Sequence, residues 1–79
     1  MNENEELAEA VRIAAECHRK QKDKNGAPYI LHPLRMLNRA VVGGYSRPIQ
    51  TVAVLHDVIE DCKEWSLDKL KKAGFSPLV

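Results

Sequence analysis

The segment VAVLHDVIED, residues 52–61, constrains the fold of this chain more than any other stretch of its sequence. It belongs to the longest apolar stretch of the chain, and Ser46 and Pro48 ahead of it are typical of a helix N-terminus. We therefore predict a helix that begins after Ser46 and runs to about Cys62. Its apolar residues lie almost all round the helix, with Val52, Leu55, Ile59 and Cys62 on one side and Val54 and Val58 near the boundary. A helix of this kind is expected to be central and buried.

The polar residues of this helix gather within an arc of about 140°, because each residue turns a helix by about 100°. They are His56, Asp57, Glu60 and Asp61. Ionisable groups on a buried helix are costly unless they are paired or bound to a cation. The pattern therefore favours an arc that faces a cavity holding a metal ion. The alternative, an arc that is merely the solvent face of the helix, stays open at this point.

A third metal ligand could come from His32, which precedes Pro33 in a segment that reads as a loop. A proline has no amide proton, so His32 has less to cap there, although an ordinary loop histidine remains the alternative. Two imidazoles and one carboxylate suit zinc, manganese, iron or nickel better than calcium. We predict a metal site formed by His32, His56 and Asp57. Glu60 and Asp61 would then orient and deprotonate a water molecule.

Three further helices are expected from capping residues and helical spacing. The first follows a frayed tail, residues 1–4, is capped by Asn4 and ends at Gly26 and Pro28. The second opens at Pro33 and stops at Gly43–Gly44, and a short fourth helix runs from Ser66 to Gly74. The predicted inward positions are Leu7, Val11, Ala14 and His18 in the first helix and Leu34, Leu37 and Val41 in the second. No segment alternates as a strand does, so the fold class is all-α.

The final residues, Ser76 to Val79, read as the opening of a fifth helix, a cap followed by proline and apolar residues. The chain stops there, and we therefore expect residues 1–79 to form one partial domain of about four helices, truncated relative to a full bundle. The helices that would be missing should leave apolar surface uncovered. Large uncovered patches drive association, so we predict a homodimer or a domain-swapped assembly.

Composition excludes several classes of protein. Hydrophobic residues make up 44% of the chain and charged residues 29%, as in soluble globular proteins. A net charge of +1 gives no field that favours DNA or an anionic membrane, and no apolar run reaches the roughly 18 residues of a membrane span. Two cysteines, Cys17 and Cys62, are too few for a disulfide framework, so a cytoplasmic protein with free thiols is the simplest interpretation.

Three residues outside the predicted metal site also have candidate roles. Lys24 precedes a turn at Asn25–Gly26 that could aim its side chain at a phosphate group, although basic residues here also solvate a helix C-terminus. Tyr29 could stack on a base, but packing in the core is favoured. His18 is predicted to be a core-facing imidazole that hydrogen-bonds a neighbour. No Walker-type glycine loop is present, which excludes a P-loop NTPase.

Two separated segments, CHRKQKDKNGAPYILHP and AVLHDVIED, resemble the N-terminal half of the HD-domain phosphohydrolases. The nearest branch is that of the RelA/SpoT-type hydrolases of guanosine tetra- and pentaphosphate. The resemblance implies an HD-domain-like helical bundle, a divalent cation that is most often Mn²⁺, and removal of the 3′-pyrophosphate from a (p)ppGpp nucleotide.

Carried over by position, the resemblance implies that His32, His56 and Asp57 bind the metal. Glu60 and Asp61 match the acidic pair that acts on the attacking water, and Lys24 matches a basic residue lining the nucleotide site. This chain departs from the family pattern in two places. Asp23 stands where many members carry arginine, and the family's last metal ligand, an aspartate in a later helix, has no counterpart, because Asp68 comes too early. We expect weak or absent turnover from these residues alone, and the alternative function is a non-catalytic module that binds a nucleotide or a protein.

Overall fold

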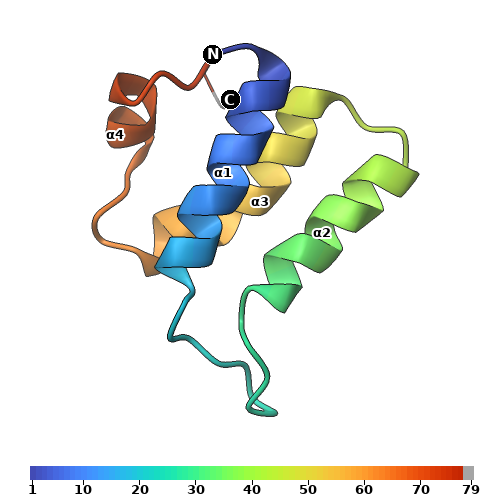
Figure 1. Cartoon of the computed structure of the whole chain (residues 1–79), viewed down its shortest axis with the longest axis vertical. Helices are drawn as coiled ribbons and strands as arrows, with labels where there is room; N and C mark the ends of the chain where they lie inside the picture. Colours follow the sequence, from blue (N-terminus) through green and yellow to red (C-terminus); the bar gives the residue numbers. More distant parts are fainter. Residues whose placement is uncertain (78–79) are drawn as a thin grey trace.

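A computed structural model of the chain describes residues 1–77. Within that range the chain forms four helices: α1 (Glu3–Cys17), α2 (Leu31–Val42), α3 (Arg47–Asp61) and α4 (Leu67–Lys72). Figure 1 shows their arrangement. The described residues contain no strand, and one isolated bridge pairs Lys22 with Pro28. The predicted all-α fold class is therefore confirmed.

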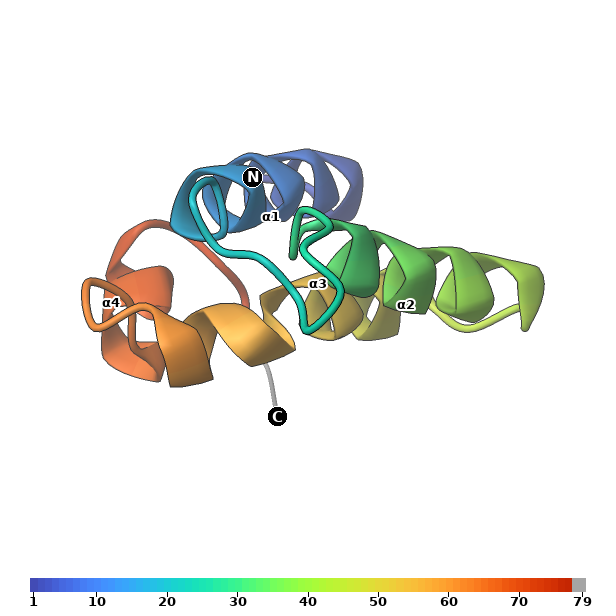
Figure 2. The same cartoon turned by 90° about the horizontal axis from the view of Figure 1, so that it is seen from below.

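Helix α3 is the central element, because α1 and α2 both pack against it (Figures 1 and 2). The core forms where α1 meets α3, and Leu70 and Phe75 close it from the C-terminal segment. The other buried apolar residues of this core are Ala10, Ile13, Ala14, Val54, Leu55 and Val58. Small alanines on α1 let the two helices approach closely while Leu55 and Val58 fill the space between them. Burying one such valine or leucine side chain contributes about 1.5–3 kcal/mol.

The predicted inward face of α3 is rotated from the observed one. Val54 and Val58, expected at the boundary, are fully buried, whereas Val52 is exposed. The reason is that two helices contact neighbouring flanks of α3, so its core face is centred between them. On α1 the prediction missed Ile13, which is buried, while Leu7 and Val11 are only partly buried.

Helix α1 begins earlier than the sequence predicted. Asn2, not Asn4, is the N-cap, and its side-chain oxygen accepts a 2.8 Å hydrogen bond from the Glu5 amide. The Glu5 carboxylate in turn accepts a 2.8 Å bond from the Asn2 amide. This reciprocal pair satisfies two amides that a helix start would otherwise leave free. The expected frayed tail, residues 1–4, is therefore wrong for residues 3 and 4.

The segment between α1 and α2 is a hydrogen-bonded loop rather than a continuation of α1, which ends at Cys17 instead of reaching Gly26. The Asp23 carboxylate accepts bonds from the amides of Asn25 (2.8 Å) and Ala27 (3.0 Å), and Gly26 adopts a φ of 82°. A side chain that caps nearby amides competes with helix and favours a turn. Helix α2 then starts at Leu31, so His32 lies in the first helical turn and not in a loop.

Cys17 and Cys62 form a disulfide between the C-terminal ends of α1 and α3, with their Cα atoms 6.0 Å apart. The prediction of free thiols is therefore wrong. Spacing along the chain could not reveal the pairing, because it depends on α1 and α3 ending at the same place in the fold.

No helix within residues 1–77 is long and apolar enough to cross a membrane. The cytoplasmic location stays a prediction.

Helix α2 is much less buried than α1 and α3. Pro33 and Ala40 are its only buried residues, and Leu34 and Val41, which the sequence placed on an inward stripe, are exposed. Leu31, Met36 and Val42 of α2 and Tyr45 just after it are exposed as well. The expected uncovered apolar surface is thus present on α2.

The C-terminal segment returns to α1, where the buried Glu6 carboxylate accepts a hydrogen bond from the Ser76 amide. Ser76 and Pro77 are not helical. The remainder of the predicted fifth helix, Leu78 and Val79, lies outside the described residues, and the predicted partial domain over residues 1–79 stays a prediction.

Candidate metal centre

Asp57 is the residue of the candidate site through which the two sequence motifs contact each other. Helix α3 holds it half-buried, and its Oδ2 atom accepts a 3.0 Å hydrogen bond from the Tyr29 hydroxyl. The Nε2 atom of His32 lies 3.4 Å from the same oxygen. Tyr29 and His32 flank the start of α2, so the packing of α2 on α3 brings the two separated motifs together.

Tyr29 holds this carboxylate while remaining neutral. Burial raises the pKa of its hydroxyl to about 12, and the hydrogen bond to Asp57 and the negative charge of that carboxylate add to the shift. The more distant charges of Asp61 and Glu60 act in the same direction. The preference for core packing over exposed stacking is consistent with the partly buried ring, which also lies 4.8 Å from the His18 ring.

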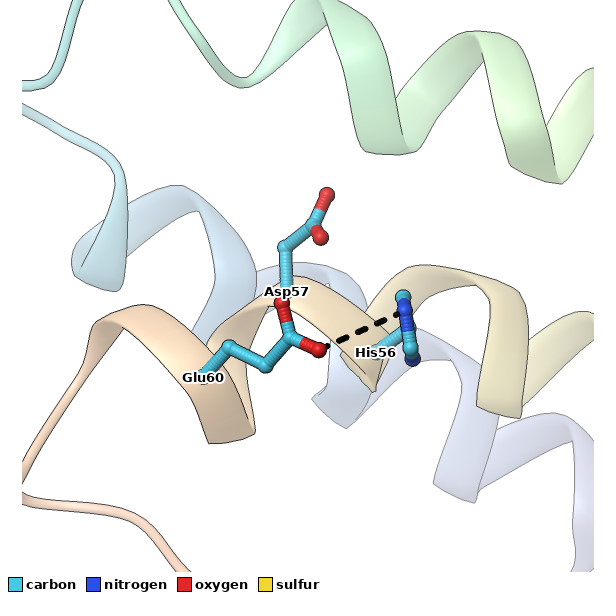
Figure 3. A group of neighbouring side chains, drawn as sticks. All are labelled: His56, Asp57 and Glu60. Atoms are coloured by element: carbon cyan, nitrogen blue, oxygen red, sulfur yellow. Dashed lines mark ion pairs between the residues drawn. The ribbon is translucent and has the colours of Figure 1, made fainter.

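His56 and Glu60 lie one helical turn apart on α3, on either side of Asp57 in the sequence (Figure 3). The His56 Nε2 atom is 3.8 Å from a Glu60 oxygen. Taken together, His56, Asp57 and Glu60 each offer one ligand atom, and these atoms all lie within 4.8 Å of one another. Both His56 and Glu60 are exposed, with side-chain exposures of 69% and 64%. The polar arc of α3 is therefore largely open, with only Asp57 partly buried at 16% side-chain exposure, and the expected metal-holding cavity stays a prediction.

The donor atoms around Asp57 fit a divalent cation. Nitrogen and oxygen ligands at about 2.1 Å from a tetrahedral metal lie about 3.4 Å apart, and wider ligand angles separate them further. The 3.4 Å between His32 and Asp57 matches this spacing. The ligand atoms of His56, Asp57 and Glu60, within 4.8 Å of one another, must come closer to share an ion, because two ligands at about 2.1 Å can be no more than about 4.2 Å apart. Asp57 belongs to both groups. The predicted set of His32, His56 and Asp57 stays a prediction, and Glu60 emerges as a further candidate ligand.

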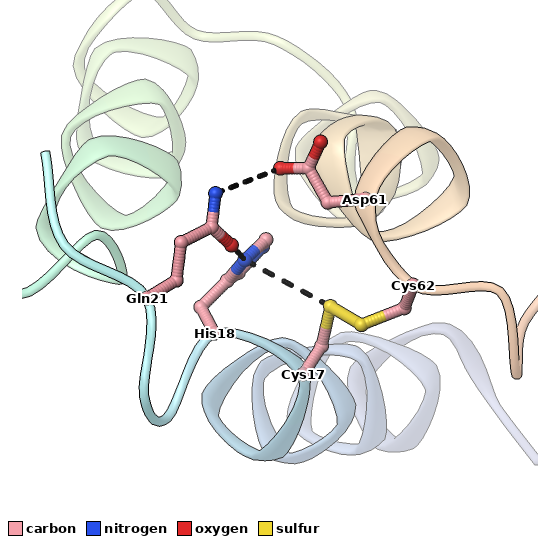
Figure 4. Close-up of a disulfide and its surroundings, with 5 residues drawn as sticks. All are labelled: Cys17, His18, Gln21, Asp61 and Cys62. Atoms are coloured by element: carbon pink, nitrogen blue, oxygen red, sulfur yellow. Dashed lines mark hydrogen bonds between the residues drawn. A yellow bond between two sulfur atoms is a disulfide. The ribbon is translucent and has the colours of Figure 1, made fainter.

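Asp61 faces a different neighbour from the other three arc residues. Its Oδ2 atom accepts a 3.2 Å hydrogen bond from the side-chain amide of Gln21. The oxygen of that amide lies 2.8 Å from the Nδ1 atom of His18, which is buried (Figure 4). The prediction that His18 is a hydrogen-bonded core residue is confirmed. Sequence reasoning missed Gln21; its position three residues after a predicted core histidine was the available signal.

A shallow hollow of about 360 Å³ is lined by His32 and by Lys24, the predicted phosphate ligand. Besides His32 and Lys24, its lining includes Lys22, Asp23, Tyr29 and Arg35. Three cationic side chains therefore surround one hollow beside the metal-ligand candidates. Sequence reasoning missed Arg35, although its position three residues after His32 places both on one face of a helix.

The sequence of this chain is similar to a protein-family profile and to several known proteins. A sequence profile described as HD domain matches residues 10–79. The chain is 40% identical over 57 residues, 72% of its length, to a guanosine-3′,5′-bis(diphosphate) 3′-pyrophosphohydrolase of Aquifex aeolicus. It is 41% identical over 59 residues, 70% of its length, to an enzyme of the same description from Danio rerio. A GTP pyrophosphokinase of Streptomyces coelicolor is 34% identical over 67 residues, 85% of this chain.

The relatives are longer proteins. The match covers 8% of the Aquifex and Streptomyces proteins and 33% of the Danio protein. No solved structure gives a significant match to this chain.

Proposed function

This chain belongs to the HD-domain family, and we propose that it binds a divalent cation at Asp57 and uses it for phosphoester hydrolysis. The observation that carries the proposal is the convergence on one carboxylate. Asp57 meets His32 from α2 at 3.4 Å and shares a cluster with His56 and Glu60 from its own helix. Imidazole and carboxylate donors in this number suit a first-row divalent metal, and we propose Mn²⁺.

The proposed substrate is a guanine nucleotide with a 3′-pyrophosphate, because two of the relatives are described as hydrolases of that compound. The cationic hollow beside His32 supports a substrate of high negative charge. Lys24, Lys22 and Arg35 would each offset phosphate charge there, while Asp23 is occupied in capping its own turn. Arg35 carries a planar guanidinium suited to paired contacts with phosphate oxygens.

In the proposed mechanism, the chemistry that a divalent cation would supply at this site is a lower pKa for water and polarisation of a phosphoryl oxygen. His32, His56 and Asp57 would hold the cation, and the Tyr29 hydroxyl fixes the orientation of the Asp57 carboxylate. Glu60, left unligated in this assignment, would take up a proton as a general base, and Asp61 would orient the attacking water. Lys24 would bind the departing pyrophosphate.

This proposal is tested by measuring pyrophosphate release from guanosine 3′,5′-bis(diphosphate) with Mn²⁺. Wild-type release is expected to be weak, as the sequence predicts. Asp57→Asn keeps the size of the side chain but removes its charge, so we expect that release to fall by at least the roughly 10–100-fold typical of losing an outer-shell partner. Asp68→Asn on α4 is the matched control, because Asp68 is an exposed carboxylate outside the cluster. Equal activities of the two variants would contradict the proposal.

A second candidate function is binding of metal and nucleotide without turnover. The high exposure of His56 and Glu60 favours it, because an active site normally excludes water from the reacting groups. The two functions separate when Mn²⁺ occupancy and pyrophosphate release are measured on one sample. Stoichiometric metal with no release supports the binding module, whereas release that scales with occupancy supports the hydrolase.

We also propose that the chain self-associates through α2. Five of its large apolar side chains are exposed: Leu31, Leu34, Met36, Val41 and Val42. Sedimentation velocity at increasing concentration should show a dimer. A well-folded monomer at all concentrations would remove this proposal.

A further inference from the structure

The ends of α1 and α3 are joined twice. The first link is covalent, between Cys17 and Cys62. The second is a side-chain bridge in which Gln21 connects His18 to Asp61. Cys17 precedes His18 in the sequence and Cys62 follows Asp61, so the two links lie side by side (Figure 4).

The bridge has a defined direction. The Gln21 amide oxygen can only accept, so the Nδ1 atom of His18 carries the proton that is donated across 2.8 Å. The amide nitrogen then donates to the Asp61 carboxylate at 3.2 Å. A primary amide anchored at its oxygen presents its nitrogen in a fixed plane. Asp61, although exposed, therefore has a preferred orientation.

His18, which holds Gln21 in this bridge, is buried at a cost in folding free energy. His18 is 1% exposed, and its Nε2 atom is buried without a hydrogen-bond partner among residues 1–77. A buried acceptor left unsatisfied costs about 1–3 kcal/mol. An apolar residue would fill the same space without that cost. What the imidazole adds is the Nδ1 contact that orients Gln21.

From these contacts we propose that Gln21 is a positioning residue for Asp61, and that the Cys17–Cys62 disulfide holds the two helix ends at the separation the bridge requires. The part concerning turnover rests on the proposed function. Breaking the disulfide frees the helix ends and weakens the bridge. By reciprocity, breaking the bridge makes the disulfide easier to reduce.

The reductant required is a dithiol. One of its thiolates attacks a sulfur of the Cys17–Cys62 bond and forms a mixed disulfide, and its second thiol then closes the reductant's own disulfide. The reaction leaves Cys17 and Cys62 as thiols, with both electrons and both protons supplied by the dithiol. The two cysteines are only partly buried, so a small dithiol can reach them.

The test is the redox equilibrium of the disulfide against dithiothreitol, measured without metal for three variants. Gln21→Glu keeps the acceptor for His18 but places a carboxylate against Asp61, and Gln21→Met removes both hydrogen bonds without adding charge. Both should shift the equilibrium toward the reduced protein by about fivefold or more, because each loses the exposed hydrogen bond to the Asp61 carboxylate and Gln21→Met also loses the bond to His18. Lys20→Gln is the control for charge, because it also lowers the net charge by one unit at an exposed neighbouring position. Equilibria of both Gln21 variants within twofold of the wild type would overturn the proposal.

Turnover provides the second readout. Gln21→Met should lower kcat for Mn²⁺-dependent pyrophosphate release by about fivefold while KM and Mn²⁺ affinity stay within twofold, because Asp61 acts on water and not on the metal. A merely structural role would weaken metal affinity and kcat together. If the wild type shows no release, the proposed function fails, while the redox equilibrium still decides whether bridge and disulfide are coupled.

Discussion

The two packing partners of α3 hold it very differently. On the α1 side, fully buried residues such as Ala14 and Leu55 form a continuous core, and a disulfide ties the helix ends together. On the α2 side, only Pro33 and Ala40 are buried. The same helix is therefore anchored on one flank and lightly covered on the other.

This difference divides the candidate site. His56, Asp57 and Glu60 stand on the helix that the α1 core fixes, whereas His32 and Tyr29 depend on the packing of α2. A metal that binds both groups would join the weakly held half of the molecule to the strongly held half. A metal that binds only the folded state stabilises that state. Because the metal would tie α2 to α3, while α1 is already held by the core, it should stabilise α2 more than α1.

The largest expected effect comes from truncating matched leucines on the two sides. Leu55→Ala should lower the free energy of unfolding by about 2–5 kcal/mol, because Leu55 is 1% exposed in the α1–α3 core. Leu34→Ala on α2 should cost less than about 1 kcal/mol, because Leu34 is already 36% exposed. Urea denaturation followed by circular dichroism measures both, and equal losses would break the comparison.

The disulfide should account for a somewhat smaller part of the difference. It closes a loop with a sequence separation of 45, and removing such a link typically costs about 2–4 kcal/mol. The double variant Cys17→Ser/Cys62→Ser should show this loss in urea denaturation under non-reducing conditions. With dithiothreitol present, wild type and variant should unfold at the same midpoint; a persistent gap would mean that the serines, not the missing bond, cause the loss.

Tyr29 should make the α2 side sensitive to high pH. Its folded pKa of about 12 is above the ordinary value of 10.0, so its contribution to stability is full below about pH 10 and is lost as the pH rises through 12. Tyr29→Phe removes this titration. The difference in unfolding free energy between wild type and variant should narrow from pH 9 to pH 12, and a constant difference would show that the hydroxyl is not perturbed.

The smallest effect is expected on the outer surface of α2. Val42 is 79% exposed, so Val42→Ser should change the free energy of unfolding by no more than about 0.5 kcal/mol. The same variant should weaken the proposed dimer, which sedimentation velocity would detect as a higher dissociation constant. A large loss of stability in the monomer would show that the outer surface of α2 is packed, contrary to the light packing of α2 on α3.

The sequence predicted the elements of this fold better than their contacts. Ser46, Gly43–Gly44 and Ser66 act locally, and the helix boundaries they predicted lie within a residue or two of the observed ones. The inward face of α3 and the pairing of Cys17 with Cys62 depend on where α1 lies. The periodicity of a single helix carries no information about the position of another helix. The early end of α1 at Cys17 was missed because the segment that follows contains no glycine or proline before Gly26. A lone aspartate in this basic segment also gave no clear signal of the turn that Asp23 caps.

The candidate site shows the same division. His56, Asp57 and Glu60 lie together because their spacing along one helix places them there, and the sequence alone gave that arc. The meeting of His32 with Asp57 was proposed from chemistry and from family resemblance, and the 3.4 Å separation is consistent with it. Gln21 was missed because its role depends on a contact with Asp61 from another segment, and Arg35 because its role depends on the hollow that it lines with the loop before α2, although each lies three residues after a histidine already singled out.

Paramagnetic broadening by Mn²⁺ tests the central claim most directly. In a titration of ¹⁵N-labelled protein, the amide signals around Asp57, His56 and His32 should broaden first and together, at substoichiometric metal, because they surround one ion. Asp57→Asn should abolish this selective broadening, and Asp68→Asn should leave it unchanged. Broadening that spreads evenly over the exposed carboxylates, or that reaches His56 without His32, would contradict a shared metal centre.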